Sequence, residues 1–129
     1  MAVYLDSSAI VKLAVREPES DVLRRHLRRK RPFVSSALAR TEVMRSVLRY
    51  DDLAIASARR SLLRIDLVRV NDRILEIAGT MLPQTLRSLD AIHLATALRL
   101  ADDLTELVTY DDRMADTARD MGFRVVAPS

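Results

Sequence analysis

The chain has 129 residues, of which 49% are hydrophobic, and this is the length and apolar content of one ordinary α/β domain. It contains no cysteine, which excludes disulfides and thiolate metal sites, and no apolar run approaches the roughly 20 residues of a membrane span. The net charge is +3, and nearly all of the positive charge comes from arginine. The N-terminal residues lack the features of a signal peptide, so we expect a cytoplasmic protein.

Short apolar runs alternate with helical patterns along the chain. Strands are expected at residues 3–5, 33–35, 67–70, 107–109 and 124–126. Helices are expected at residues 9–15, 19–31, 36–48, 51–63, 71–79, 88–100 and 112–121, with N-caps at Ser36, Asn71 and Ser88. This order predicts an α/β fold, a single three-layer α/β/α domain over residues 1–129 with a short parallel sheet of four to five strands. Two consecutive helices between the second and third strands predict a helical arm beside the sheet.

Acidic residues follow two of the expected strands. Asp6 ends the first strand, and Asp111 and Asp112 follow the fourth. The functional crevice of an open parallel sheet lies beyond the carboxyl ends of its strands, so these acids fall where a site is expected. Each acid taken alone is explained equally well as a helix cap. The joint pattern favours a site.

Two further acids lie within expected helices. Asp90 lies in a helix that is apolar almost all round, where a carboxylate costs several kcal/mol unless it is paired or bound to a metal. A contact with the helix dipole explains an acid in the first turn but not its place among core residues, so a functional role is favoured. Glu42, taken alone, is predicted to form a surface ion pair with Arg45.

The types of these residues indicate which metal they suit. The only histidines are His26 and His93, and without cysteine they make a zinc site improbable. Carboxylate oxygens with vacant water positions suit Mg²⁺ or Mn²⁺, ions that activate water and neutralise phosphate charge. His93 lies one helical turn after Asp90, and we do not assign it as a base.

Four segments, in this order, make the chain similar to the VapC-type toxins of the PIN-domain ribonuclease family: Tyr4–Ala9, Thr41–Val43, Arg87–Ala97 and Val108–Asp111. The third segment is the most specific, and the set spans almost the whole chain. The resemblance implies a PIN-like fold with an acidic Mg²⁺ (or Mn²⁺) pocket. The residues it implies as both catalytic and metal-binding are Asp6, Glu42, Asp90 and Asp111.

The resemblance also implies supporting residues and a biological role. Thr109 matches the hydroxyl residue that orients the pocket, Ser8 stands where relatives often have Asn, and Asp112 is a further possible ligand beside the matching acid. The implied protein is the toxin of a type II toxin–antitoxin system, an endoribonuclease that cleaves RNA phosphodiesters with metal-activated water. It is expected to form a homodimer and to be inhibited by a VapB-type antitoxin in a hetero-oligomer.

Two other enzyme classes with acids at strand ends fit poorly. A response-regulator receiver needs a lysine at the end of its last strand, whereas the only lysines here are Lys12 and Lys30. A haloacid-dehalogenase-type phosphatase needs a second Asp two residues after the first, where this chain has Ser8. The alternative that stays open is a non-catalytic PIN-like domain that binds RNA or a partner.

A basic run lies in the second expected helix. Arginine forms forked pairs with phosphate, which suits contact with nucleic acid, but the chain has no Trp and few aromatic residues for stacking on bases. The run is expected to contact RNA phosphates, to meet the antitoxin or merely to be a solvated helix face. It comprises Arg24, Arg25, Arg28, Arg29, Lys30 and Arg31.

Overall fold

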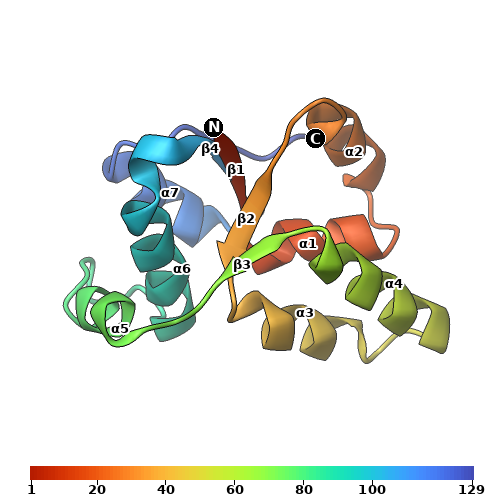
Figure 1. Ribbon diagram of the computed structural model, residues 1–129, viewed down its shortest axis with the longest axis horizontal. Coiled ribbons are helices and arrows are strands. Elements are labelled where there is room, and N and C mark those ends of the chain that lie inside the picture. Colours follow the sequence, from red (N-terminus) through yellow and green to blue (C-terminus); the bar gives the residue numbers. More distant parts are fainter.

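The centre of the molecule is one parallel sheet of five strands in the order β3-β2-β1-β4-β5 (Figure 1). The computed structural model describes all 129 residues. The strands are β1 (Ala2–Leu5), β2 (Phe33–Ser36), β3 (Asp66–Val68), β4 (Leu104–Val108) and β5 (Val125–Val126). The predicted parallel sheet is therefore confirmed, including the short edge strand at the C-terminal end of the chain.

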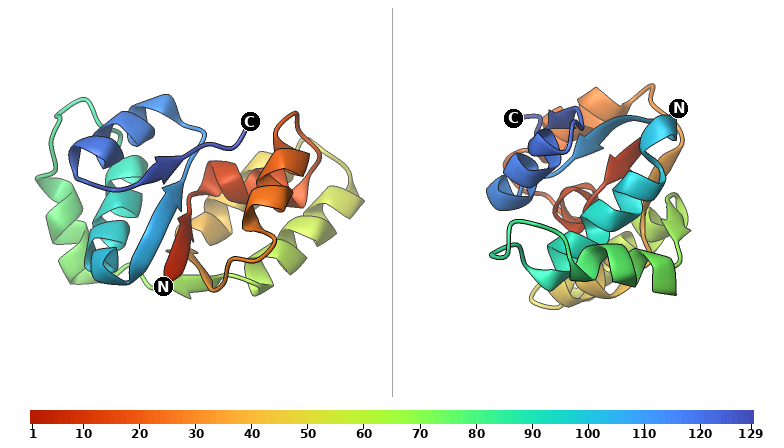
Figure 2. Two further views of the ribbon diagram at one scale, coloured as in Figure 1. Left: turned by 90° about the horizontal axis from the view of Figure 1, so that it is seen from above. Right: turned by 90° about the vertical axis from the view of Figure 1, so that its left-hand side faces the viewer.

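Seven α-helices cover both faces of the sheet (Figures 1 and 2). They are α1 (Ser7–Ala14), α2 (Ser20–Leu27), α3 (Ala39–Val47), α4 (Asp52–Leu63), α5 (Asp72–Gly79), α6 (Ser88–Arg99) and α7 (Asp112–Asp120). Helices α1 to α4 form one layer, in which α3 and α4 pack on α1 as the predicted arm. Helices α6 and α7 form the other layer, with α5 packed on α6. None of the helices has the length and apolar character that crossing a bilayer requires.

The core is divided by the alternation of side chains along β1. Val3 and Leu5 are buried against the layer of α1 to α4, whereas Tyr4 is buried against α6 and α7. Burial on both faces explains why the strands are short continuous apolar runs rather than alternating ones. It also places the phenol of Tyr4 inside the layer that carries α6.

Several expected helix boundaries are wrong. Ser36 is the last residue of β2, and its Oγ accepts a hydrogen bond from the Leu38 N–H (3.1 Å) in the turn before α3. Ser88 lies inside the first turn of α6, whose N-cap is Arg87. The basic helix ends at Leu27 rather than at Arg31, and residues 28 and 29 form a turn in which the Lys30 N–H donates to the Leu27 carbonyl.

The sheet changes direction between β1 and β4, and this is its switch point. The chain adds β2 and β3 on one side of β1, and then β4 and β5 on the other. Helix α1 therefore leaves β1 toward one face, while α7 leaves the neighbouring β4 toward the opposite face. Open α/β sheets bind ligands at such a switch point, beyond the carboxyl ends of the strands, and we refer to this place after β1 and β4 as the crevice. Asp6 directly follows β1, and Asp111 begins α7 after β4.

We predict opposite effects of the same substitution at the two glycines. Gly122 closes α7 at φ +93°, so Gly122→Ala should lower the free energy of unfolding by about 1 kcal/mol. Gly79 is the last residue of α5, and an added Cβ there would have nothing within 4 Å. Gly79→Ala should therefore leave the free energy of unfolding unchanged or raise it by up to about 1 kcal/mol. Urea denaturation of both variants measures this, and equal effects would contradict the assigned helix ends.

Candidate functional site

Asp6 is held by hydrogen bonds from the first turn of α1 and from Thr109, the residue that follows β4. Its Oδ1 accepts from the Ala9 N–H (3.0 Å) and from the Ser8 hydroxyl (2.6 Å), and its Oδ2 accepts from the Thr109 hydroxyl. The bond from Ala9 makes Asp6 the N-cap of α1, so this helix begins at Ser7, two residues earlier than expected. Asp6 is only 4% exposed. The capping role and a role in a site, weighed as alternatives for Asp6, are therefore compatible.

The two hydroxyls that bind Asp6 also tie it to the chain after β4. Ser8 Oγ accepts from the Tyr110 N–H (3.0 Å), and Thr109 Oγ1 accepts from the Asp111 N–H (3.1 Å). The expectation that Thr109 orients the carboxylate agrees with this geometry, and Ser8 gives the same kind of support. Burial raises the pKa of the Asp6 carboxyl, and the hydrogen bonds from Ser8, Thr109 and Ala9 offset that rise only in part.

Glu42 points into the molecule rather than along the surface of α3. Its Oε1 accepts hydrogen bonds from the Ser7 hydroxyl (2.6 Å) and from Nε2 of His93 (2.7 Å). The surface ion pair with Arg45 does not form, because the carboxylate is held between α1 and α6 instead. Burial acts to raise the pKa of Glu42, but the hydrogen bonds from His93 and Ser7 outweigh it and leave this pKa lowered. Glu42 is therefore poised to be ionised.

Asp90 and Asp111 border the same crevice. Asp90 stands half-buried in the first turn of α6, and Asp111 is the N-cap of α7, with its Oδ1 accepting from the Met114 N–H (3.0 Å). Burial raises the pKa of Asp90, and the negative charge of Asp111 raises it further, with a smaller contribution from Asp6. Arg87 and His93 oppose this rise. Mutual repulsion among three carboxylates indicates that the fold has brought them near one another.

The acids do not form a closed set of metal ligands. No three of the Asp, Glu and His side chains are arranged to hold an ion as they stand. Asp6 and Glu42 instead accept hydrogen bonds from protein donors, and Asp112 is exposed on the first turn of α7. The donor chemistry nevertheless fits Mg²⁺, which takes one or two carboxylates and keeps several waters. The metal-binding role of the four acids stays a prediction.

His93 and Tyr4 are the functional candidates that sequence reasoning missed. His93 is 2% exposed, and besides Glu42 it contacts the Tyr4 hydroxyl through Nδ1 (2.8 Å). The signal in the sequence was a histidine one turn after Asp90 in a helix that is apolar almost all round, because a buried imidazole needs partners at both nitrogens. Only the three-dimensional structure identifies those partners, which lie 89 and 51 residues away in the chain.

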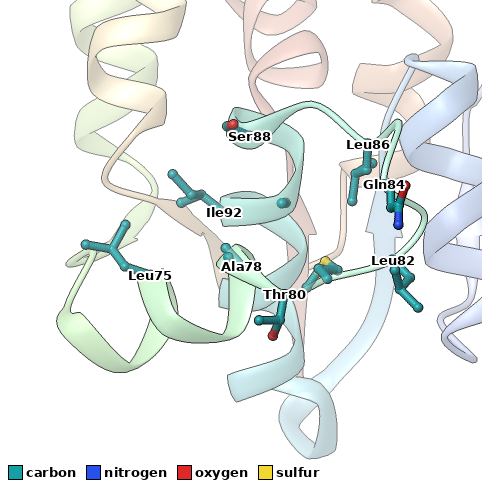
Figure 3. A pocket seen from close by; sticks show the side chains of 11 residues that line it. Leu75, Ala78, Thr80, Leu82, Gln84, Leu86, Ser88 and Ile92 are labelled. Atoms are coloured by element: carbon teal, nitrogen blue, oxygen red, sulfur yellow. The ribbon is translucent and has the colours of Figure 1, made fainter.

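A mostly apolar hollow of about 510 Å³ lies beside the site rather than in it (Figure 3). Its walls come from α5, the loop between α5 and α6, and the first two turns of α6, including Leu75, Leu86 and Ile92. None of the four predicted acids lines it. The hollow therefore borders the same first turn of α6 that carries Asp90, although Asp90 itself does not line it.

The predicted basic run contributes to a second hollow, of about 200 Å³. Phe33 and Ile65 in its wall stand at the amino ends of β2 and β3, so this hollow is at the opposite end of the sheet from Asp6. No carboxylate lines it. Its arginines are Arg24, Arg28, Arg31 and Arg64.

Two side chains of the basic segment, residues 24–31, contact a buried acid. His26 Nε2 lies 2.7 Å and Lys30 Nζ 3.6 Å from Oε1 of Glu106, whose side chain is 1% exposed on β4. These contacts satisfy a carboxylate that would otherwise be buried alone. The basic segment is therefore partly structural and not a uniformly solvated face.

Comparisons with known proteins identify the family of this chain and agree with its fold. The PIN domain family matches residues 3–120. Ribonuclease VapC46 of Mycobacterium tuberculosis is 62% identical over 128 residues, covering 99% of this chain and 98% of the relative. A toxin–antitoxin complex from Klebsiella pneumoniae contains a chain that is 25% identical with a TM-score of 0.73, and the match covers 98% of each chain. The crystal structure of M. tuberculosis VapC20, a toxin that cleaves the sarcin–ricin loop, has the same fold (TM-score 0.75, 18% identity, 98% and 99% coverage).

We predict that the acidic crevice destabilises the protein in the absence of a metal ion. The pKa of Asp90 is raised in the folded chain, so ionising this group costs stability as the pH rises above about 4, its ordinary range. Asp90→Asn should therefore raise the melting temperature of the metal-free protein at pH 7 by a few degrees, and this gain should vanish below about pH 4.

Mn²⁺ should raise the melting temperature of the parent protein, because a cation relieves the repulsion among the acids. The double variant Asp6→Asn plus Asp90→Asn should lose most of that increase. Thermal melting with and without Mn²⁺ measures both effects. A parent protein that Mn²⁺ does not stabilise, or a double variant stabilised equally, would show that these acids do not form the ion's site.

Proposed function

Because the chain belongs to the PIN-domain family and, within it, to the VapC ribonucleases that are toxins of toxin–antitoxin systems, we propose that it hydrolyses RNA phosphodiesters in the crevice at the switch point. The carboxylates of this crevice would hold Mg²⁺ or Mn²⁺. They are Asp6, Glu42, Asp90 and Asp111. The observation that carries this proposal is that the charges of both Asp111 and Asp6 act on Asp90, while Glu42 is bound by His93, which lies one turn after Asp90 in α6.

The residues of the crevice divide into fixed and free groups. Asp6 is held by three donors, and Glu42 by two, so both carboxylates keep one orientation. No protein donor binds Oδ2 of Asp111 or the carboxylate of Asp90, so these oxygens are free to bind a cation. A bound divalent ion supplies neutralisation of phosphate charge and lowers the pKa of water, and the fixed carboxylates keep its ligands in place without reorganisation.

The proposed partners follow from the relatives and the surface. The toxin–antitoxin complex from Klebsiella pneumoniae supports a complex of this chain with an antitoxin. We propose that this antitoxin is of the VapB type, that it blocks the activity, and that it forms a hetero-oligomer with a homodimer of this chain. Exposed apolar side chains such as Leu75, Leu82 and Leu89 beside the hollow of Figure 3 provide surface that a protein partner can cover. Cellular RNA as the substrate places the activity in the cytoplasm.

A non-catalytic PIN-like domain remains the second candidate function. Such a domain would bind RNA or a partner and would have no need of an intact acid set. The presence of all four acids, with Asp6 and Glu42 each supported by several donors, favours catalysis. Cleavage of RNA in the presence of a metal separates the two candidates directly.

We predict metal-dependent cleavage that requires Asp90. Purified toxin, freed of antitoxin, should cut total cellular RNA with Mg²⁺ and should not cut it with EDTA. Asp90→Asn keeps the size of the side chain and removes its charge, so it should abolish cleavage and growth arrest while the antitoxin complex still forms. Asp120→Asn, the same change at an exposed position of α7, is the matched control and should cut at the parent rate.

Two results would refute the metal-nuclease mechanism. The first is cleavage that continues in EDTA. The second is an Asp90→Asn protein that cuts as fast as the parent. Failure of the parent itself to cut any RNA with either ion would instead support the non-catalytic alternative.

We predict that the arginine-lined hollow contacts RNA phosphates. In an Asp90→Asn background, reversing Arg28 and Arg64 to Glu should weaken RNA binding, and the slope of log K against log salt should fall by about 0.7 for each phosphate that the protein no longer neutralises. Reversing the exposed Arg73 and Arg99 is the control of equal charge. An unchanged slope, with weakened antitoxin binding instead, would assign the hollow to the antitoxin.

A further inference from the structure

A buried chain of hydrogen bonds leads from β1 to the carboxylate of Glu42. The Tyr4 hydroxyl lies 2.8 Å from Nδ1 of His93, and Nε2 of His93 lies 2.7 Å from Oε1 of Glu42. Tyr4 is fully buried, and its ring meets the imidazole edge-on with centroids 6.0 Å apart. This series of hydrogen bonds therefore runs from β1 through α6 to α3, and all three elements adjoin the crevice.

The partners of His93 determine where its proton lies. A carboxylate can only accept, so the nitrogen that faces Glu42 must carry the proton. The Tyr4 hydroxyl is protonated at neutral pH and is free to donate to Nδ1. A neutral imidazole satisfies both neighbours only as the Nε2–H tautomer. Tyr4 and Glu42 therefore favour the same tautomer, the one that donates to Glu42.

The geometry at Glu42 fixes one oxygen and leaves the other free. Both Nε2 of His93 and the Ser7 hydroxyl (2.6 Å) bind Oε1, and Ser7 Oγ lies 3.3 Å from the same Nε2. Oε2 accepts no hydrogen bond from a protein donor, and the Glu42 side chain is 23% exposed. Two donors from different helices on one oxygen restrict rotation of the carboxylate and leave Oε2 available to the crevice.

We propose that Tyr4 and His93 are positioning residues for the nuclease reaction: Tyr4 anchors the imidazole of His93 at Nδ1, and His93 together with Ser7 holds Oε1 of Glu42 and leaves Oε2 for the metal or its water. This inference rests on the proposed role of Glu42 in the crevice. Neither Tyr4 nor His93 touches the substrate, and both act through Glu42.

The first test observes the tautomer directly, without metal or RNA. In ¹⁵N–¹H correlation spectra of the full-length parent protein, His93 should show protonated Nε2 and unprotonated Nδ1. Tyr4→Phe keeps the ring and removes the donor, so Nδ1 of His93 should lose its hydrogen bond and its ¹⁵N signal should move downfield. Tyr50→Phe, the same change at an exposed tyrosine, is the control and should leave the His93 signals unchanged.

The second test is a double-mutant cycle between Tyr4 and Glu42. Tyr4→Phe should weaken Mn²⁺ binding, measured by electron paramagnetic resonance, and slow RNA cleavage by roughly tenfold each, as is usual for groups that orient a metal ligand. In a Glu42→Gln background the same substitution should change Mn²⁺ binding by less than about twofold, because the group through which Tyr4 acts has lost its charge.

Conservative replacement of His93 gives an independent readout. The amide of Gln can present an N–H where Nε2 stands, so His93→Gln should keep Mn²⁺ affinity and cleavage closer to the parent than His93→Leu does. This comparison also carries the test if Tyr4→Phe does not fold. Equal losses in the Gln and Leu variants would overturn the proposal.

The remaining outcomes separate this inference from the proposed function. One outcome is that Glu42→Gln impairs Mn²⁺ binding and that Tyr4→Phe weakens this binding by the same factor in the parent and in Glu42→Gln. The positioning role of Tyr4 and His93 is then wrong, whereas the proposed metal-dependent nuclease activity is not contradicted. An unchanged Nδ1 signal of His93 in Tyr4→Phe overturns the positioning role likewise. If Glu42→Gln has no effect on Mn²⁺ binding or cleavage while Asp90→Asn abolishes both, the role of Glu42, and with it that of Tyr4 and His93, is refuted.

Discussion

The hydrogen bond from Thr109 to Asp6 joins the two strands at which the sheet changes direction, and the rest of the site depends on this junction. β1 and β4 diverge into helices on opposite faces, so their carboxyl ends would otherwise be held together only by the ladder behind them. The hydroxyls of Thr109 and Ser8 bind the Asp6 carboxylate and, through backbone N–H groups, hold the segment that leads to Asp111. The capping bond to α1 fixes the same carboxylate from the other side.

Neutral donors hold these acids, and this choice has an electrostatic consequence. Hydroxyl and amide groups orient a carboxylate without cancelling its charge, whereas a lysine or arginine would do both. The nearest lysine, Lys12, is paired with Glu17 and Glu19, and the guanidinium of Arg87 offsets only part of the repulsion at Asp90. The carboxylates of the crevice are therefore held in fixed orientations while their negative charge is not cancelled. Such an arrangement is unfavourable for a protein's stability, and it is understandable in a site that is completed by a cation.

The parts of the fold that depend on local patterns could be predicted from the sequence, and those that depend on distant partners could not. All five strands and the N-cap at Asn71 follow from apolar runs and capping chemistry. Ser36 and Ser88 have equally good capping side chains, but β2 extends through Ser36 and Arg87 has the extended backbone of the cap before α6. Glu42 taken alone reads as a surface acid, because its partners Ser7 and His93 lie 35 and 51 residues away. Only the family resemblance pointed to Glu42, and nothing in the sequence pointed to Tyr4.

The order of events in the crevice follows from its charge. An RNA phosphate approaching four carboxylates meets net repulsion, and in a partly buried site this repulsion is screened less than on the surface. Positive charge at the far end of the sheet, around Arg28 and Arg64, can attract the RNA as a whole but cannot neutralise the crevice itself. In the proposed mechanism, productive binding of the scissile phosphate therefore requires that a divalent cation first neutralise the acids. An antitoxin can accordingly inhibit at either of two places, by filling the crevice with positive charge or by covering the arginines that gather RNA, and only the first would also displace the metal.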